Sequence, residues 1–166
     1  MANITLKNNP ITTCGNLPNI GENAKDFCLI GQDLNKVTLN DFKGERIIMN
    51  IFPSVDTGIC AISVKTFNEK VASLSNTKVF CISRDLPFAQ NRFCGAENIK
   101  NVITLSDFAT GAFGIDYGLT ITYGVLTSLH SRCIVILDES HTIIYTQQVE
   151  EITTEPNYKE ALAALS

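Results

Sequence analysis

Three nearly continuous apolar runs stand out when the chain is read for hydrophobic and polar positions. RIIMNIF at 46–52, VFCIS at 79–83 and CIVIL at 133–137 each have the length of a strand. Unbroken apolar runs of this length are typical of central strands that are covered on both faces. Shorter strands are predicted at FCLIG, KVTL, NVITL and TIIYTQQV. The long runs therefore predict the middle of a buried sheet.

The N-terminal segment ITLKNNPITT predicts a β-hairpin. Asn8, Asn9 and Pro10 lie where this segment would reverse direction. Asparagine tolerates the backbone angles of a tight turn, and proline pre-sets one of them. We therefore expect two short paired strands before the main sheet begins.

Apolar side chains recur at helical spacing in residues 58–75. Cys60, Val64, Phe67, Val71 and Leu74 follow one another at steps of four, three, four and three residues. This spacing places them on one face of an α-helix. An amphipathic helix is therefore expected between the first two buried strands.

Two further helices are predicted from the residues at their ends. Before LPFAQNRFCG, Asp85 is placed to cap a helix that has Pro87 in its first turn and Gly95 at its end. The last segment, EPNYKEALAAL, predicts a proline-initiated helix. Because strands and helices alternate, we expect an α/β fold of three layers, with a mixed central sheet flanked by helices.

Length and charge narrow the class of protein. The 166 residues, 45% of them apolar, are enough for one domain with a continuous core, which we expect to span residues 1–166. A net charge of -4 with 13 scattered basic residues argues against nucleic acid or an anionic membrane as partner. No signal peptide and no apolar run near the ~18 residues of a membrane span are seen. We therefore predict a cytosolic protein.

The cysteines carry the candidate chemistry. In a reducing cytosol a disulfide is more often catalytic than structural. No C-x-x-C occurs, so a structural zinc site and a thioredoxin-type dithiol are both disfavoured. We expect Cys28, Cys81 and Cys133 to be inert core residues, because they fall inside apolar runs, and Cys14 to lie near a loop.

Other cofactor signals are missing from the sequence. His130 and His141 lack the spacing of a metalloenzyme, and we expect both to be surface loop residues near strand ends. No glycine-rich nucleotide-binding motif is present. We therefore predict no metal, flavin or nicotinamide cofactor.

The stretch PSVDTGIC places Cys60 where a thiol can be activated. Pro53 cannot donate to a strand ladder, so the chain leaves the sheet there. If Thr57 is the N-cap, Cys60 occupies the third helical position, where unpaired N–H groups and the helix dipole favour a thiolate. The apolar stripe alone, however, favours a plain core cysteine.

The residues themselves resemble a known family. Pro53, Thr57 and Cys60 spell P-x-x-x-T-x-x-C, which resembles the active-site motif of the peroxiredoxins. NIFPSVDTGIC, RDLPFAQNRFCGAENIKNVITLSDF and VEEITTEPNYKEALAAL resemble the bacterial thiol peroxidases, an atypical two-cysteine branch, over essentially the whole chain. The resemblance implies a thioredoxin-like fold with an extra N-terminal β-hairpin.

The resemblance also implies roles for individual residues. Cys60 would be the peroxidatic cysteine, Thr57 the hydroxyl that hydrogen-bonds thiolate and peroxide, and Pro53 the shield against water. Arg132 would complete the site with its guanidinium, although nothing in its local sequence distinguishes it from a solvated charge at a strand end. Cys94 would be the resolving cysteine, which forms a disulfide with Cys60 in the same subunit.

The catalytic cycle that this implies is a thiol-dependent reduction of hydroperoxides. Alkyl hydroperoxides would be the preferred substrates and hydrogen peroxide a further one, thioredoxin would be the reductant, and the protein would be a homodimer. Leu86, Phe88 and Phe93 either border the substrate pocket or anchor their helix. Disulfide formation needs Cα atoms within about 7 Å, so we expect the first turn after Thr57 and residues 86–95 to rearrange together.

Two alternative functions remain open from the sequence. A peroxide-sensing redox switch would use the same two cysteines with little turnover. A general thiol-disulfide oxidoreductase would act without peroxide, although the lack of C-x-x-C disfavours it.

Overall fold

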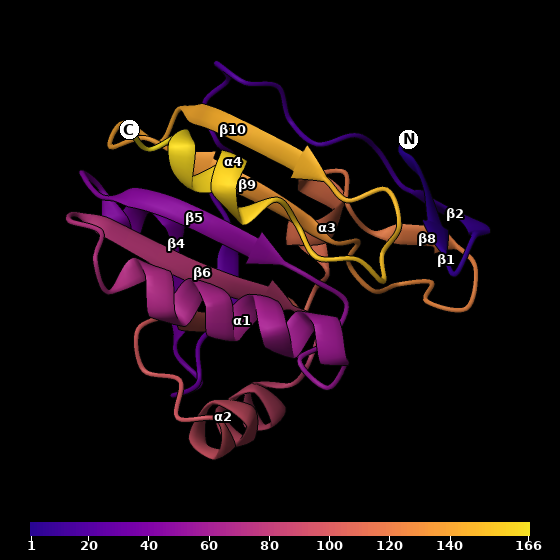
Figure 1. Cartoon of the computed structure of the whole chain (residues 1–166), viewed down its shortest axis with the longest axis horizontal. Coiled ribbons are helices and arrows are strands. Elements are labelled where there is room, and N and C mark those ends of the chain that lie inside the picture. Colours follow the sequence, from indigo (N-terminus) through magenta and orange to yellow (C-terminus); the bar gives the residue numbers. More distant parts are fainter.

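The computed structural model describes residues 1–166 and contains two β-sheets (Figure 1). The strands are β1 (Asn3–Leu6), β2 (Asn9–Thr13), β3 (Cys28–Ile30), β4 (Lys36–Thr38), β5 (Arg46–Ile51), β6 (Thr77–Ser83), β7 (Ile103–Ser106), β8 (Ile121–Tyr123), β9 (Cys133–Leu137) and β10 (Ile143–Gln148). The helices are α1 (Gly58–Val71), α2 (Pro87–Ala96), α3 (Ala112–Asp116) and α4 (Tyr158–Ala163), with a 3₁₀ helix, η1, at Leu39–Phe42.

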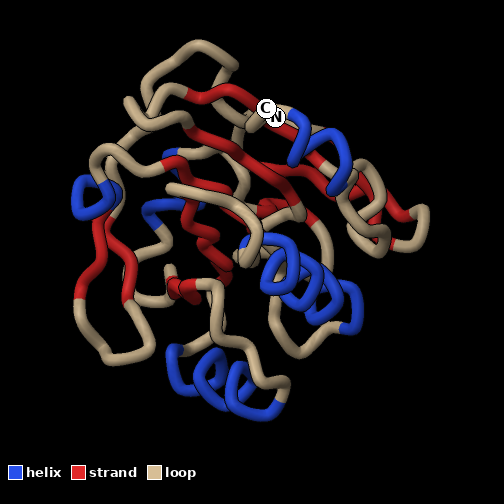
Figure 2. Tube along the Cα trace, turned by 60° about the vertical axis from the view of Figure 1, so that its left-hand side comes forward, coloured by secondary structure: helices blue, strands red, loops and turns tan.

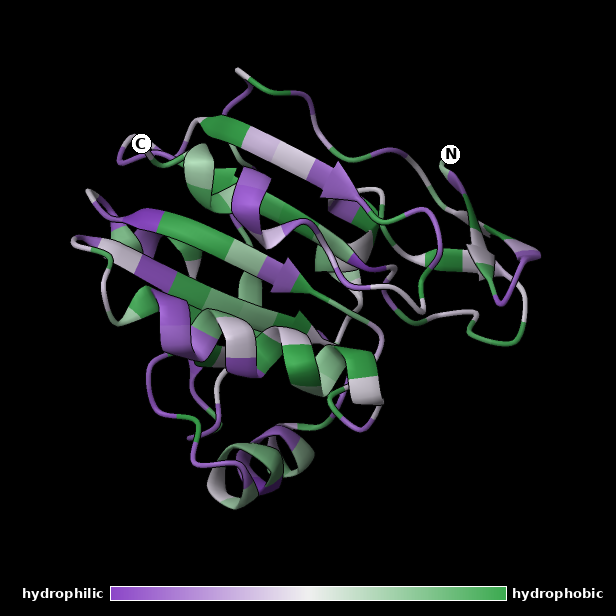
Figure 3. Ribbon diagram, viewed as in Figure 1, coloured by the Kyte–Doolittle hydropathy of each residue, from purple (hydrophilic) through white to green (hydrophobic).

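A seven-stranded mixed sheet forms the centre, in the order β10-β9-β5-β6-β7-β3-β4. The strands β5, β6 and β7 run parallel, whereas β9 and β3 are antiparallel to their neighbours β5 and β7. The three long apolar runs became β5, β6 and β9, which lie side by side and are mostly hydrophobic (Figure 3). The prediction of a mixed sheet with buried middle strands is confirmed.

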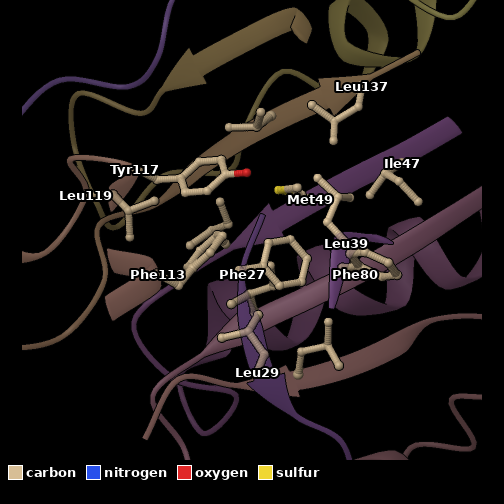
Figure 4. Packing of buried hydrophobic residues seen from close by; sticks show 14 of the residues in the cluster. Phe27, Leu29, Leu39, Ile47, Met49, Phe80, Phe113, Tyr117, Leu119 and Leu137 are labelled. Atoms are coloured by element: carbon tan, nitrogen blue, oxygen red, sulfur yellow. The ribbon is translucent and has the colours of Figure 1, made fainter. Parts of the chain in front are cut away.

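Successive residues of β5 face two different cores. Ile47, Met49 and Ile51 join a cluster with Phe27, Phe113 and other side chains on one face (Figure 4). Ile48 instead packs with the buried face of α1 on the other. Helices α1, α2 and α4 contribute to this second cluster and α3 to the first, so the sheet lies between helical layers (Figure 2).

The helix ends differ in part from expectation. Thr57 is the N-cap of α1, as predicted. The N-cap of α2, however, is Leu86 rather than Asp85, and α2 continues through Gly95 to Ala96. The last helix is capped by Asn157, whose side chain accepts a hydrogen bond from Glu160 N. The three helices are therefore confirmed, but α1 ends at Val71 rather than near residue 75, and Pro156 precedes the N-cap of α4 instead of starting the helix.

The predicted hairpin forms a small second sheet. Lys7 and Asn8, with φ of 51° and 64°, make the turn between β1 and β2, and both lie in the left-handed region that suits a tight hairpin. The strand β8, which the sequence pattern did not predict, pairs with β2. This sheet lies at one end of the molecule (Figure 1).

Two expectations about exposure were wrong. His130 is fully buried, and its Nε2 lies 3.4 Å from Oδ2 of buried Asp107, so it is not a surface loop residue. Cys28 is exposed, because β3 is short and buries the neighbouring Leu29 instead. His141 lies half-buried in the turn before β10, near its predicted place. None of the helices has the length and apolar character needed to cross a membrane.

Candidate active site

The loop after β5 is held by a carboxylate from the neighbouring strand end. Asp85, just after β6, accepts hydrogen bonds from Ser54 Oγ at 2.7 Å and from Val55 N at 2.8 Å. Ser83 Oγ donates to the same carboxylate at 2.7 Å. Because β5 and β6 are parallel neighbours, their carboxyl ends meet at one edge of the sheet. Asp85 therefore fixes the loop that leads into α1 and does not cap α2.

The N-cap residue of α1 contacts the cysteine one turn later. Thr57 Oγ1 lies 2.7 Å from Cys60 Sγ and is placed to donate its proton to the sulfur. Its other possible acceptor is Ser54 O, at 3.2 Å. A hydroxyl has one proton, so the shorter contact to sulfur competes with the longer one. Cys60 occupies the third position of α1, as predicted, and is fully buried.

Arg132, the residue before β9, contacts the same sulfur. Its Nη2 lies 3.3 Å from Cys60 Sγ, and its Nε donates to Ile152 O at 2.9 Å. Its Nη1 is buried and has no hydrogen-bond partner. With 2% of its surface exposed, Arg132 is not a solvated strand-end charge. A guanidinium stays protonated and acts only as a hydrogen-bond donor, so at this distance it can donate to the sulfur.

A surface pocket leads to these groups. It has a volume of about 230 Å³, and Pro53, Thr57 and Arg132 contribute to its wall. The apolar part of the lining consists of Leu6, Ile59, Leu126, Leu129 and Ile152. Cys60 itself is not on the pocket surface but lies directly behind Thr57 and Arg132. The pocket therefore gives a small molecule access to the donors that surround the thiol.

Three apolar side chains near Cys94 in the sequence do not line this pocket. Leu86 and Phe88 are 50% and 66% exposed, whereas Phe93 is buried in the core under α1. None of the three lines the wall that contains Thr57 and Arg132. None of them therefore borders the pocket at Thr57 and Arg132, and only Phe93 is buried so as to anchor its helix.

Cys94 is buried in α2, and no disulfide joins it to Cys60. Burial raises the pKa of the Cys94 thiol, and neighbouring Gln32 and Thr104 offset this only in part. Cys60 has Thr57 and Arg132 as neighbours, so the two thiols share no hydrogen-bonding partner. The structure therefore brings together four of the five predicted site residues, whereas Cys94 lies in the same buried hydrophobic cluster as Cys60 without a hydrogen bond to any of the four.

The remaining cysteines have no polar partner suited to chemistry. Burial raises the pKa of both Cys81 and Cys133 to about 12, which confirms them as core residues. Cys14 is half-buried and contacts Gly114 O at 3.6 Å. No group of three or more His, Cys, Asp or Glu side chains is arranged to hold a metal ion.

The sequence reasoning missed two parts of the site. Asp85 was read only as a helix cap, although parallel pairing of the two strands would have placed it beside residues 53–55. Ile152, whose backbone carbonyl holds Arg132, lies in the stretch VEEITTEPNYKEALAAL that carries part of the family resemblance, but no residue of this stretch was predicted to contact the site.

Comparison with known proteins agrees with this geometry. The Redoxin family matches residues 19–162. Thiol peroxidase from Corynebacterium glutamicum is 48% identical over 166 residues, and thiol peroxidase from Mycobacterium bovis is 50% identical over 165, with 99% or more of each chain covered.

A solved structure extends the likeness to the whole fold. The crystal structure of a peroxiredoxin-like protein from Aquifex aeolicus superposes with a TM-score of 0.92 at 36% identity, and covers 98% of this chain and 95% of its own. The predicted thioredoxin-like fold with an N-terminal hairpin is thus confirmed. The chain belongs to the thiol peroxidases, a group of peroxiredoxin enzymes within the redoxin family.

Proposed function

We propose that Cys60 is the nucleophile that reduces a hydroperoxide, with Thr57 and Arg132 as the donors that activate it. The observation that supports this most strongly is the convergence of Thr57 Oγ1, at 2.7 Å, and Arg132 Nη2, at 3.3 Å, on a single sulfur. Both groups can donate hydrogen bonds to a thiolate. Arg132 stays protonated, so it cannot act as the base that removes the thiol proton. Pro53, a buried residue of the loop between β5 and α1, limits the access of water.

The chemical step is a displacement at oxygen. The Cys60 thiolate attacks the terminal oxygen of the hydroperoxide, the O–O bond breaks, and the leaving oxygen takes a proton to become an alcohol or water. Sulfur loses two electrons and becomes a sulfenic acid. Arg132 Nη1, which has no protein partner, is available to donate to the leaving oxygen as negative charge develops on it.

The second cysteine completes the cycle. The Cys94 thiolate attacks the Cys60 sulfenic sulfur, forms the disulfide and releases water. Both thiols are free and lie in one buried hydrophobic cluster, on α1 and α2, and we infer that these two helix segments rearrange for the sulfurs to bond. A dithiol then reduces the disulfide, and we infer that thioredoxin is this reductant. We also infer a homodimer and a cytosolic location.

The pocket favours a hydroperoxide that carries an alkyl or aryl group. Its volume of about 230 Å³ exceeds that needed by hydrogen peroxide, and five of its lining residues are hydrophobic. Burial of apolar surface stabilises a bound organic group by about 25 cal/mol per Å². Alkyl hydroperoxides are therefore the preferred substrates, and hydrogen peroxide is a slower one.

Peroxide consumption in the presence of thioredoxin, thioredoxin reductase and NADPH tests this function. Wild type should turn over cumene hydroperoxide faster than hydrogen peroxide. Cys60→Ser should be inactive, and Cys94→Ser should consume one equivalent of peroxide and then stall. Cys14→Ser is the matched control and should behave as wild type. Full activity in Cys60→Ser would overturn the proposal, whereas a wild type that is oxidised only once would be a redox switch.

A further inference from the structure

We propose that Glu151 is a positioning residue for Arg132, and that it acts by tying the N-terminal hairpin to the loop that carries Ile152. This inference rests on the function proposed above. It assigns a role in catalysis to the small three-stranded sheet, which lies at one end of the molecule, apart from the seven-stranded one (Figure 1).

The Glu151 carboxylate gathers donors from two separate segments. Lys7 N and Asn8 N, both in the hairpin turn, donate to it at 3.0 Å each. Thr5 Oγ1 donates at 2.8 Å from β1. Thr153 donates through its backbone N at 3.1 Å and through Oγ1 at 2.6 Å. A single half-buried side chain thus holds the turn of the hairpin against the loop before α4.

Backbone hydrogen bonds on either side of Glu151 extend the same junction. Thr5 N donates to Glu150 O at 2.7 Å, and Ile152 N donates to Thr5 O at 2.9 Å. The Ile152 side chain is buried with Ile4, Ile11 and Ile121 from the small sheet. The position of the Ile152 peptide is therefore set largely by the hairpin.

The junction ends at the guanidinium that contacts the thiol. Ile152 O is the acceptor for Arg132 Nε at 2.9 Å, and Arg132 Nη2 reaches Cys60 Sγ at 3.3 Å. A guanidinium is planar and rigid, so the bond at Nε fixes the direction of both terminal nitrogens. If Ile152 O shifts, Arg132 Nη2 leaves the sulfur. Misplacement of a reacting group by about 1 Å can lower a rate by about 100-fold.

The charge of Glu151 persists over the working range of the enzyme. Five hydrogen bonds from Asn8, Thr153, Lys7 and Thr5 hold the pKa of the carboxyl well below its usual range. Charge-assisted bonds of this kind are stronger than neutral ones. The carboxylate is therefore ionised at neutral pH, where it accepts all five bonds.

Three variants and one matched control test the inference in the full-length protein. Glu151→Ala removes all five bonds, Glu151→Gln keeps one acceptor oxygen, and Thr5→Val removes one donor. Glu150→Ala removes a neighbouring exposed carboxylate for which no side-chain hydrogen bond is found. We would measure the rate of Cys60 oxidation in a single turnover, with cumene hydroperoxide and with hydrogen peroxide. The pH midpoint of Cys60 alkylation by iodoacetamide would be measured by mass spectrometry.

The expected result is a graded loss that is equal for both peroxides. Glu151→Ala should oxidise 10- to 100-fold more slowly, about the cost of a misplaced reacting group. Glu151→Gln and Thr5→Val should fall between this variant and wild type, and Glu150→Ala should equal wild type. The alkylation midpoint should move to higher pH in Glu151→Ala, because the displaced Arg132 no longer stabilises the thiolate; a purely structural effect would leave it unchanged.

Other outcomes would overturn the inference. If Glu151→Ala and Glu150→Ala have the same oxidation rate and the same alkylation midpoint, Arg132 is held in place without the hairpin. A loss confined to cumene hydroperoxide would show that the junction only shapes the apolar wall at Leu6. If Glu151→Ala does not fold, the same comparison is decided by Glu151→Gln and Thr5→Val. Activity retained by Cys60→Ser in this assay would instead overturn the proposed function.

Discussion

Arg132 Nη2 lies 3.3 Å from Cys60 Sγ, although 72 residues separate the two in the chain. The sheet creates this contact. Ile51, the last residue of β5, pairs with Cys133, the first residue of β9. Antiparallel pairing therefore places the residue before β9 beside the loop after β5, which leads into the first turn of α1, where Cys60 lies. The mixed sheet thus sets the geometry of the candidate site.

Arg132→Gln should lower the rate of Cys60 oxidation by about 100-fold or more, since it removes a preorganised charged donor from the transition state. Arg46→Gln is the matched control, because Arg46 also lies at the start of a strand but binds Leu165 O and Ser75 O instead. Single-turnover oxidation measured by stopped flow separates the two variants. An equal rate in both would show that proximity of Arg132 to the sulfur has no catalytic effect.

Leu129→Ala should slow the reaction with cumene hydroperoxide more than the reaction with hydrogen peroxide. Leu129 lines the pocket at Thr57 and Arg132, and its truncation removes apolar contact with an organic group but not with hydrogen peroxide. Loss of a buried leucine contact is worth about 1–3 kcal/mol, or about 10- to 200-fold. Phe88→Ala, which changes an exposed residue outside the pocket, should leave the ratio of the two rates unchanged.

Arg92→Gln should accelerate disulfide formation after Cys60 has been oxidised. Arg92 Nη2 on α2 lies 2.8 Å from Asp56 Oδ1 in the loop before α1, and this ion pair restrains the two segments that rearrange in the proposed cycle. Both side chains are largely exposed, so the pair contributes at most about 1 kcal/mol, and the acceleration should not exceed about fivefold. Appearance of the disulfide is measured by quenched flow. The rate difference between wild type and Arg92→Gln should shrink in high salt, because salt weakens the ion pair in wild type. A slower step in Arg92→Gln would mean that the pair assists the rearrangement.

Stability should fall as the pH rises above about 8.5, because two core thiols resist ionisation. Burial raises the pKa of Cys81 and Cys133 to about 12, whereas an unfolded thiol titrates at about 8.5. Below about 8.5 the stabilisation is fully present. Between the two values the unfolded chain loses protons that the folded chain keeps, so the free energy of unfolding decreases with pH.

The melting temperature between pH 7 and pH 10.5 measures this effect. Cys133→Ala should lower the melting temperature at pH 7, because it leaves a small cavity, but should also flatten the alkaline decline. Cys28→Ser, at an exposed position, should keep the wild-type slope. A slope in Cys133→Ala as steep as in wild type would show that the buried thiols do not account for the decline.

The sequence predicted the strands and helices more completely than it predicted the surroundings of individual side chains. The apolar runs identified β5, β6 and β9, and Pro53 with Thr57 marked the start of α1, because these signals are local. The burial of Arg132 depends on which strands become neighbours, which no local pattern records. His130 looked like a polar loop residue for the same reason, since its partner Asp107 comes from a distant segment.

Cys28 and Glu151 show two other limits. A three-residue strand has too few positions to reveal which face it buries, and the apolar run around Cys28 suggested a core position that its neighbour Leu29 takes instead. Glu151 acts through donors that are mostly backbone N–H groups, and these leave no trace in residue identity. The resemblance to the peroxiredoxins supplied the residues proposed as catalytic but not the groups that hold them.

The most direct test of the account is to locate the sulfenic acid. Reduced Cys94→Ser would be treated with one equivalent of cumene hydroperoxide in the presence of dimedone, and the labelled residue would be found by peptide mass spectrometry. The account predicts one label per chain, on Cys60, and no label in Arg132→Gln on the same timescale. A label on another cysteine, such as exposed Cys28, with Cys60 unmodified would contradict it.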